Sequence, residues 1–235
     1  MREDICSIPI NDIFGPKDGC PFCRMRDMLE DRMSTYITGA AMMEPDVRVE
    51  TNQKGFCKTH FDMILERGSR LSVALILESL LDNVKDDIMP RSKPPIKKIL
   101  PNAERRATSC FVCENVDKNM EHLTSTVINM WASDTEFRRL YAEQDHICAI
   151  HYTFILRAAL KMPKKYLSDF RDVTQSLTEK YIDVLRNDVT HFCRMFDYRN
   201  KGGDWGNSKD SIERTIEYLT ARPVTTSTKT EGKNR

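Results

Sequence analysis

Long hydrophobic runs are missing from this sequence of 235 residues. The longest unbroken apolar run, Val73 to Leu77, has five residues, whereas a membrane-spanning helix needs about 20. The N-terminus carries Arg2, Glu3 and Asp4 where an export signal would have a basic start followed by an apolar stretch. These absences predict a soluble chain that stays in the cytoplasm and has no membrane partner.

Net charge is nearly absent as well. The 36 basic and 35 acidic residues leave a formal charge of +1, so no global field would hold the chain on nucleic acid. Eight cysteines among 235 residues are too few for a small disulfide scaffold, in which cysteine exceeds roughly 8%. A reducing cytosol would not preserve disulfides either. Metal ligation is therefore the leading use for cysteines that cluster.

Most of the cysteines fall into a pattern with histidine that occurs twice. The pattern is a CxxC pair followed by a CxxH pair: Cys20, Cys23, Cys57 and His60, then Cys110, Cys113, Cys148 and His151. The two CxxC pairs are offset by 90 residues and the two CxxH pairs by 91. A period of this length is too long for a solenoid repeat, so it indicates a duplicated module.

Three thiolates and one imidazole form a common closed ligand set for structural zinc. A closed set leaves no coordination position for water, which favours a structural over a catalytic metal. We therefore predict two Zn²⁺ ions per chain, held by the eight residues of the repeat. An iron–sulfur cluster on the same ligands is the alternative, and thiol redox chemistry at the CxxC pairs is another, although no βαβ pattern accompanies them. Spacing leaves open whether ligands are shared between modules or chains.

Apolar residues recur at three- and four-residue steps along most of the chain, and no stretch alternates with period two. The sequence thus predicts an all-α fold with two duplicated zinc-stapled helical modules, a long helix and a short C-terminal helix. The predicted divisions are a first Cys3His module (1–88), a linker (89–106), a second Cys3His module (107–166), a C-terminal region that packs on the modules (167–221), with its long helix at about 168–198, and a disordered tail (222–235).

The predicted linker is basic and rich in proline. Four prolines lie between Met89 and Arg106, where basic residues far outnumber the single acid. Such a composition is typical of an exposed connector. A basic run can contact phosphates, but the segment has no aromatic residues for stacking on bases. A solvated connector is therefore favoured, and nucleic acid is not an expected partner.

Polar and charged residues gather around a glycine turn near the C-terminus, in FDYRNKGGDWGNSKD. They form a candidate ligand or interaction surface made of Asp197, Arg199, Asp204, Trp205, Asn207, Asp210 and Arg214. The favoured alternative is a structural corner in which Trp205 packs on the core and Arg199 pairs with Asp210. No paired nucleophile and base, phosphate-binding glycine loop or HExxH motif stands out. No catalytic residue is therefore predicted, and an enzymatic role is disfavoured.

Three segments, CPFC, GFCKTHF and FDYRNKGGDWGNSKDSIER, together resemble the uncharacterised bacterial family called domain of unknown function 6062, over nearly the whole chain. The resemblance implies a bacterial cytosolic protein with a CPxC motif and no established activity. The second pair, CFVC, departs from this motif because it lacks the proline. Residues and resemblance together predict a zinc-binding helical protein that serves as a binding, scaffold or regulatory protein for an unidentified protein partner.

Overall fold

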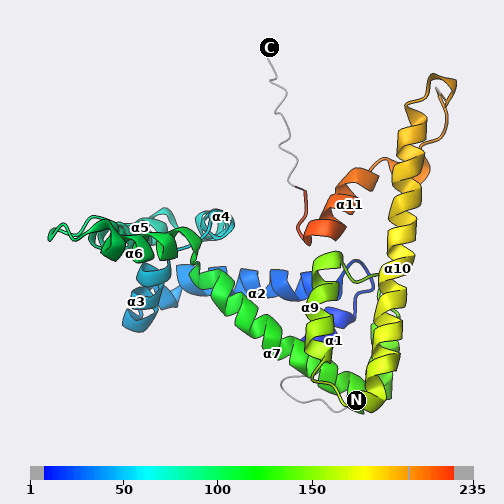
Figure 1. Cartoon of the computed structure of the whole chain (residues 1–235), viewed down its shortest axis with the longest axis horizontal. Coiled ribbons are helices and arrows are strands. Elements are labelled where there is room, and N and C mark those ends of the chain that lie inside the picture. The colour runs from blue at the N-terminus through cyan, green and yellow to red at the C-terminus, as the bar shows by residue number, and fades with distance from the viewer. Residues whose placement is uncertain (1–7, 201, 225–235) are drawn as a thin grey trace. The chain divides into compact units, whose positions relative to one another are not determined.

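The computed structural model describes residues 8–200 and 202–224, which are helical with no strand among them (Figure 1). This confirms the all-α prediction. None of the helices in these ranges is long and apolar enough to cross a membrane. The α-helices are α1 (Ile8–Phe14), α2 (Pro21–Thr38), α3 (Pro45–Lys54), α4 (Lys58–Arg67), α5 (Arg70–Ile88), α6 (Ile96–Thr108), α7 (Phe111–Ser133), α8 (Thr135–Ala142), α9 (Ala149–Ala159), α10 (Lys164–Met195) and α11 (Ser211–Thr220). Short 3-10 helices occupy Ala40–Met43, Tyr198–Asn200 and Gly206–Ser208.

The chain divides into two compact units. Unit 1 contains the described residues of Met1–Arg24 and Leu123–Arg235, and unit 2 is Met25–His122. The boundaries between them fall inside α2 and inside α7. This division differs from the modules 1–88 and 107–166 that the repeat predicts, because each unit combines the CxxC pair of one copy with the CxxH pair of the other.

Unit 1 has an aromatic core. The ring of Tyr141 on α8 lies 5.8 Å from Phe14, 5.1 Å from Trp131 and 5.4 Å from Phe170, measured between centroids. Tyr141 is fully buried, and its hydroxyl bonds to Thr174 Oγ1 at 2.9 Å. These contacts hold α8 against α10, and α9 and α11 pack on α10 as well (Figure 1).

The long helix predicted at about 168–198 is α10, which spans Lys164–Met195. It starts directly after Pro163, whose fixed φ suits the start of a helix. The short helix predicted after the glycine turn is α11. Residues 225–235 of the predicted tail lie outside the described residues.

Unit 2 packs α3, α4 and α6 against α5. The exposed linker predicted over 89–106 is helical in its second half, where α6 begins at Ile96. The carboxylate of Asp87 on α5 pairs with Arg105 at 2.9 Å and with Arg106 at 2.6 Å. Two of the basic residues assigned to a solvated connector therefore tie the end of α6 to α5.

Candidate metal centres

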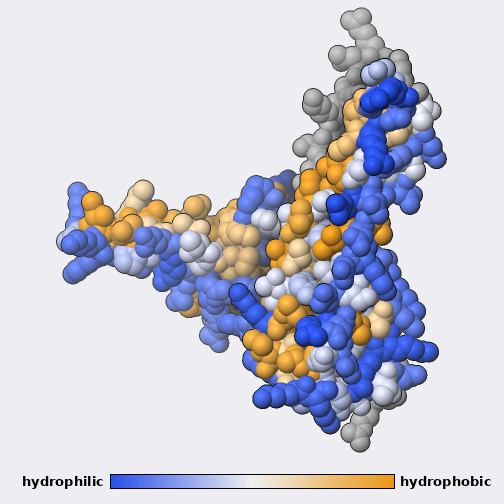
Figure 2. Space-filling view, turned by 45° about the vertical axis from the view of Figure 1, so that its right-hand side comes forward, coloured by the Kyte–Doolittle hydropathy of each residue, from blue (hydrophilic) through white to orange (hydrophobic). Residues whose placement is uncertain are grey.

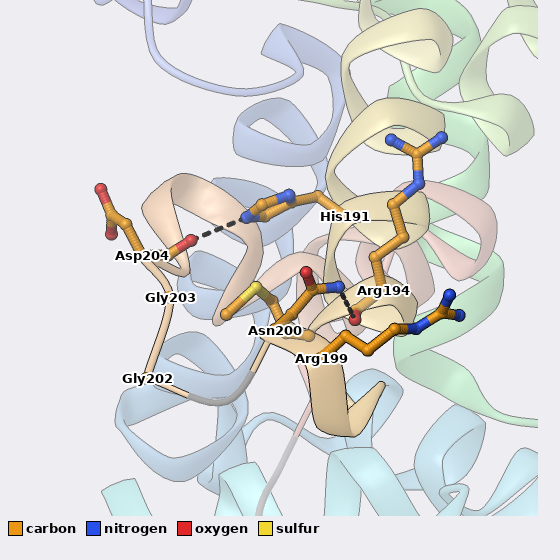
Figure 3. A pocket seen from close by; sticks show the side chains of 8 residues that line it. His191, Arg194, Arg199, Asn200, Gly202, Gly203 and Asp204 are labelled. Carbon is orange, nitrogen blue, oxygen red and sulfur yellow. Dashed lines mark hydrogen bonds between the residues drawn. The ribbon is translucent and has the colours of Figure 1, made fainter.

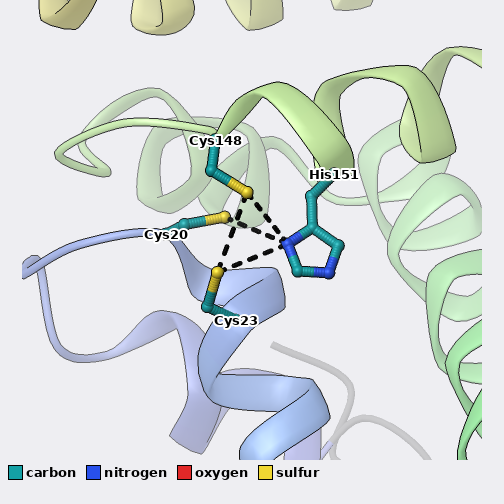
Figure 4. A group of neighbouring side chains, drawn as sticks. All are labelled: Cys20, Cys23, Cys148 and His151. Carbon is teal, nitrogen blue, oxygen red and sulfur yellow. Dashed lines mark hydrogen bonds between the residues drawn. The ribbon is translucent and has the colours of Figure 1, made fainter. Parts of the chain in front are cut away.

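The eight residues of the repeat meet in two groups of four. Site 1 consists of Cys20, Cys23, Cys148 and His151 (Figure 4), and site 2 of Cys57, His60, Cys110 and Cys113. Within each group the ligand atoms all lie within 4.8 Å of one another. The CxxC pair of each copy thus meets the CxxH pair of the other copy. The predicted modules 1–88 and 107–166 do not each enclose a site of their own.

Two helix starts form site 1 (Figure 4). Gly19, with φ at 66°, turns the chain before Cys20, and Pro21 opens α2. The backbone N–H of Cys23 in the first turn of α2 donates to the Cys20 carbonyl at 3.0 Å. Cys148 is the residue before α9, which places His151 in the first turn of that helix. The partial positive charge of both helix N-termini favours the thiolate form that a bound metal requires.

The interatomic distances of site 1 have the size of a tetrahedral metal site. Sγ of Cys23 lies 3.7 Å from Sγ of Cys148. Nδ1 of His151 lies 3.7, 3.4 and 3.2 Å from the sulfurs of Cys20, Cys23 and Cys148. A tetrahedral zinc ion would place two sulfurs about 3.8 Å apart, and sulfur and nitrogen about 3.6 Å apart. A disulfide would need about 2.05 Å, so the geometry fits a shared ion.

Site 2 is built in the same way. Cys57 precedes α4 with His60 in the first turn, and Cys110 precedes α7 with Cys113 in the first turn. Nδ1 of His60 lies 3.2, 3.3 and 3.4 Å from the sulfurs of Cys57, Cys110 and Cys113, and the Cys57 and Cys113 sulfurs are 3.8 Å apart. A backbone bond of 2.9 Å between the N–H of Phe111 and a carbonyl just before Cys57 holds the two helix starts together.

The clustered ligands shift one another's pKa values. Burial raises the pKa of Cys110, but hydrogen bonds, led by the one to His60, outweigh burial and lower it to about 6. Burial lowers the pKa of His60, yet Cys110 raises it to about 10. In site 1 the hydrogen bond to Cys20 raises the pKa of Cys148 to about 12, and the bond to Cys148 raises that of Cys23. Both sites therefore retain protons that a dication would displace on binding.

Sequence reasoning missed one residue beside site 2. Oε1 of Glu30 lies 3.5 Å from Nε2 of His60, and both side chains are buried. A signal for it exists in the sequence, because Glu30 follows Cys23 by seven residues, two turns along the helix that the first CxxC pair begins. Helical periodicity alone gave no reason to direct that carboxylate to a histidine 30 residues later.

The candidate surface near the C-terminus is a corner in which Trp205 packs on the end of α10, whereas Arg199, Asp204, Asn207 and Asp210 are exposed. Trp205 lies against Phe192 and Phe196 at the end of α10, with ring centroids 5.4 and 5.7 Å apart. Arg199 pairs with Asp197 at 2.6 Å. The predicted pairing of Arg199 with Asp210 is wrong, because Asp210 pairs with Arg214 instead.

A cavity of about 510 Å³ lies beside this corner (Figure 3). Nε2 of His191 donates to the Asp204 carbonyl at 2.9 Å, and the Asn200 side chain donates to the Arg194 carbonyl at 2.8 Å. Of the predicted surface residues, only Arg199 and Asp204 line the cavity. His191 and Arg194 were missed because they belong to α10, whose periodicity indicates packing rather than a site.

Arg214 links α11 to α10 and to the segment that precedes α11. Its guanidinium contacts Asp188 at 2.8 Å, Asp210 at 2.9 Å and the Asn207 carbonyl at 2.6 Å. We expect Arg214→Ala to lower the free energy of unfolding by about 1–3 kcal/mol, because hydrogen bonds of a charged group are lost. Urea unfolding measures this, with Arg186→Ala, an exposed arginine of α10, as the control. Equal midpoints for the two variants would contradict the assignment.

Comparison with curated proteins and with solved structures found no match for this chain. The model of one protein family, described as a family of unknown function (DUF6062), matches residues 1–226. The match contains both candidate metal centres and the C-terminal corner. The chain therefore belongs to this family of unknown function, as the resemblance of its CPFC, GFCKTHF and FDYRNKGGDWGNSKDSIER segments implied.

Proposed function

We propose that this protein is a zinc-binding helical protein in which two structural Zn²⁺ ions, one in each site, stabilise a surface for a protein partner. The observation that carries the proposal is the geometry of the ligand atoms. In both sites three sulfurs and one imidazole nitrogen lie at separations that suit a single tetrahedral ion.

The ligand set supports a structural role. Each ion would have four protein ligands and so no open position at which water or substrate is activated. Cys20, Cys110 and Cys148 are each at most 4% exposed, which disfavours exchange with an external thiol. The same donors also suit iron, and therefore the identity of the metal decides between a scaffold and an electron-transfer or redox-sensing protein.

A groove between α10 and α11 supports the partner role. It has a volume of about 300 Å³ and is lined mainly by apolar side chains, among them Ile182, Leu185, Val189 and Leu219. Figure 2 shows hydrophobic side chains gathered along this part of unit 1. Exposed apolar patches of this kind commonly mark protein interaction sites. The adjacent packing of α11 on α9 would connect the groove to site 1.

The metal content of untagged protein tests the proposal. We expect about two zinc ions per chain by elemental mass spectrometry and no visible absorption under anaerobic conditions. Bound iron with a broad absorption band at roughly 400 nm would indicate an iron–sulfur or redox protein instead. Protein that is fully folded with little or no metal would contradict both the zinc and the iron–sulfur hypotheses and would favour thiol redox chemistry.

A further inference from the structure

We propose that Glu30 is a positioning residue of site 2, which orients the His60 ring for the metal and makes site 2 release its zinc more slowly than site 1. This inference rests on the proposed function, since it concerns how the two zinc sites differ. It assigns a role to a carboxylate that is not itself among the four ligands of the site.

The geometry around His60 places the two ring nitrogens in different surroundings. Nδ1 faces the three sulfurs of site 2. Nε2 faces Oε1 of Glu30 at 3.5 Å, is buried, and forms no closer hydrogen bond to any described residue. The Glu30 side chain, 5% exposed, comes from α2, which also carries Cys23 of the other site.

A buried carboxylate beside the second nitrogen of a ligand histidine has a known chemical consequence. It keeps the ring proton on Nε2, so that the lone pair of Nδ1 is available to the metal, and it increases the basicity of the ring. Burying a carboxylate is costly unless a donor faces it. If the distance between Nε2 of His60 and Oε1 of Glu30 shortens slightly from 3.5 Å when Nδ1 binds a metal, the Nε2–H group donates a hydrogen bond to the carboxylate.

The second copy of the repeat lacks this feature. At the offset of 90 residues that relates the CxxC pairs, the counterpart of Glu30 is Met120, which has no carboxylate. His151 lies beside the ring of Phe22, with centroids 6.1 Å apart, and no ion pair to His151 exists within the described part of the chain. The duplication therefore keeps all eight ligand positions but, among the described residues, provides a carboxylate to only one of the two histidines.

Zinc release from the loaded full-length protein to an excess of a chromophoric chelator tests the proposal. We expect two phases in the wild type, a fast one from site 1 and a slow one from site 2. Cys148→Ser, which removes a ligand of site 1, assigns them because it should retain only the slow phase. Glu30→Met, which copies the residue of the other repeat, should accelerate the slow phase by about 10–100-fold and leave the fast phase unchanged. Glu30→Gln should have a smaller effect, because its amide oxygen still accepts a hydrogen bond.

Asp31→Asn is the matched control, since Asp31 is the next residue of α2 and its side chain is 58% exposed. Imidazole NMR spectra give a readout that loss of packing alone would not produce. In Glu30→Met and in Glu30→Gln the Nε2–H resonance of His60 should move while that of His151 stays in place.

Unchanged release from both sites in Glu30→Met and Glu30→Gln would overturn the role of Glu30. An equal acceleration of both phases would do so too, because it would indicate general destabilisation. Failure of the proposed function is a separate result: the wild-type protein would then contain fewer than two zinc ions before any substitution is made.

Discussion

Removal of both metal ions with a chelator is expected to lower the melting temperature by roughly 10–20 °C and to reduce the helical circular dichroism signal. Structural zinc in small domains binds with an apparent free energy of about 10–16 kcal/mol, which is largely folding free energy. If only about 5 kcal/mol of this stabilises the present chain, a Tm shift of that size follows for a protein of this length. Without metal, protons also stay on Cys23 and Cys148 in site 1 and on His60 in site 2, because the pKa of each is raised.

Unit 1 should retain more structure than unit 2 after chelation. The aromatic core around Tyr141 and Phe170 contains none of the ligands, whereas the helix starts at site 2 are joined, apart from the ligands, by polar contacts of Phe111, Ser109 and Lys54. Restoring zinc should restore the melting temperature, and magnesium at the same concentration should not. An identical melting curve with and without bound metal would contradict a structural role for the ions.

Replacing Cys57 with Ser is expected to remove one zinc ion per chain and to expose Cys110 and Cys113 to alkylation. In the folded wild-type protein these thiols should resist the reagent because they ligate a buried ion. Cys20 and Cys23 should stay protected in this variant, since their partners are Cys148 and His151. Mass spectrometry of peptides after a short exposure to iodoacetamide measures each cysteine separately.

The mirror variant, Cys148→Ser, should give the opposite pattern, with Cys20 and Cys23 labelled and site 2 protected. Cys193→Ser is the control, because Cys193 is exposed and belongs to neither group. If Cys57→Ser instead exposed Cys20 and Cys23, the ligands would be paired within each copy of the repeat. The arrangement in which each CxxC pair meets the CxxH pair of the other copy would then be wrong.

The eight residues of the two candidate sites could be predicted from the sequence because tetrahedral coordination imposes a strict local spacing. A residue just before a helix and another in its first turn, such as Cys148 and His151, place two donors on one side. The way in which the pairs combine could not be predicted. The CxxC halves of the two copies offer the same donors, and so do the CxxH halves, and only the packing of the helices between them decides which halves meet.

Two other features escaped prediction for different physical reasons. The proline-rich segment forms α6 because Pro95 stands just before its first turn, where a missing N–H costs nothing, and because Asp87 holds its end. The cavity beside Asp204 depends on where the chain turns after α10. The spacing of apolar residues predicts the helix that contains His191. It does not predict where the following loop runs, and it is this loop that brings the Asp204 carbonyl to His191.

The crossed ligand sets are nested along the chain: all four residues of site 2, from Cys57 to Cys113, lie between Cys23 and Cys148 of site 1. During synthesis from the N-terminus, the last ligand of site 2 leaves the ribosome well before His151 does. Site 2, the inner site, can therefore bind its metal before Cys148 and His151, the other two residues of site 1, have been synthesised. Formation of site 1 also closes a longer loop, from Cys23 to Cys148, than formation of site 2 does. Its entropic cost is therefore larger unless site 2 has already formed and shortened that loop. The order of the ligands thus favours assembly from the inside outwards, and a nascent chain carries its earliest pair of thiols unprotected for longest.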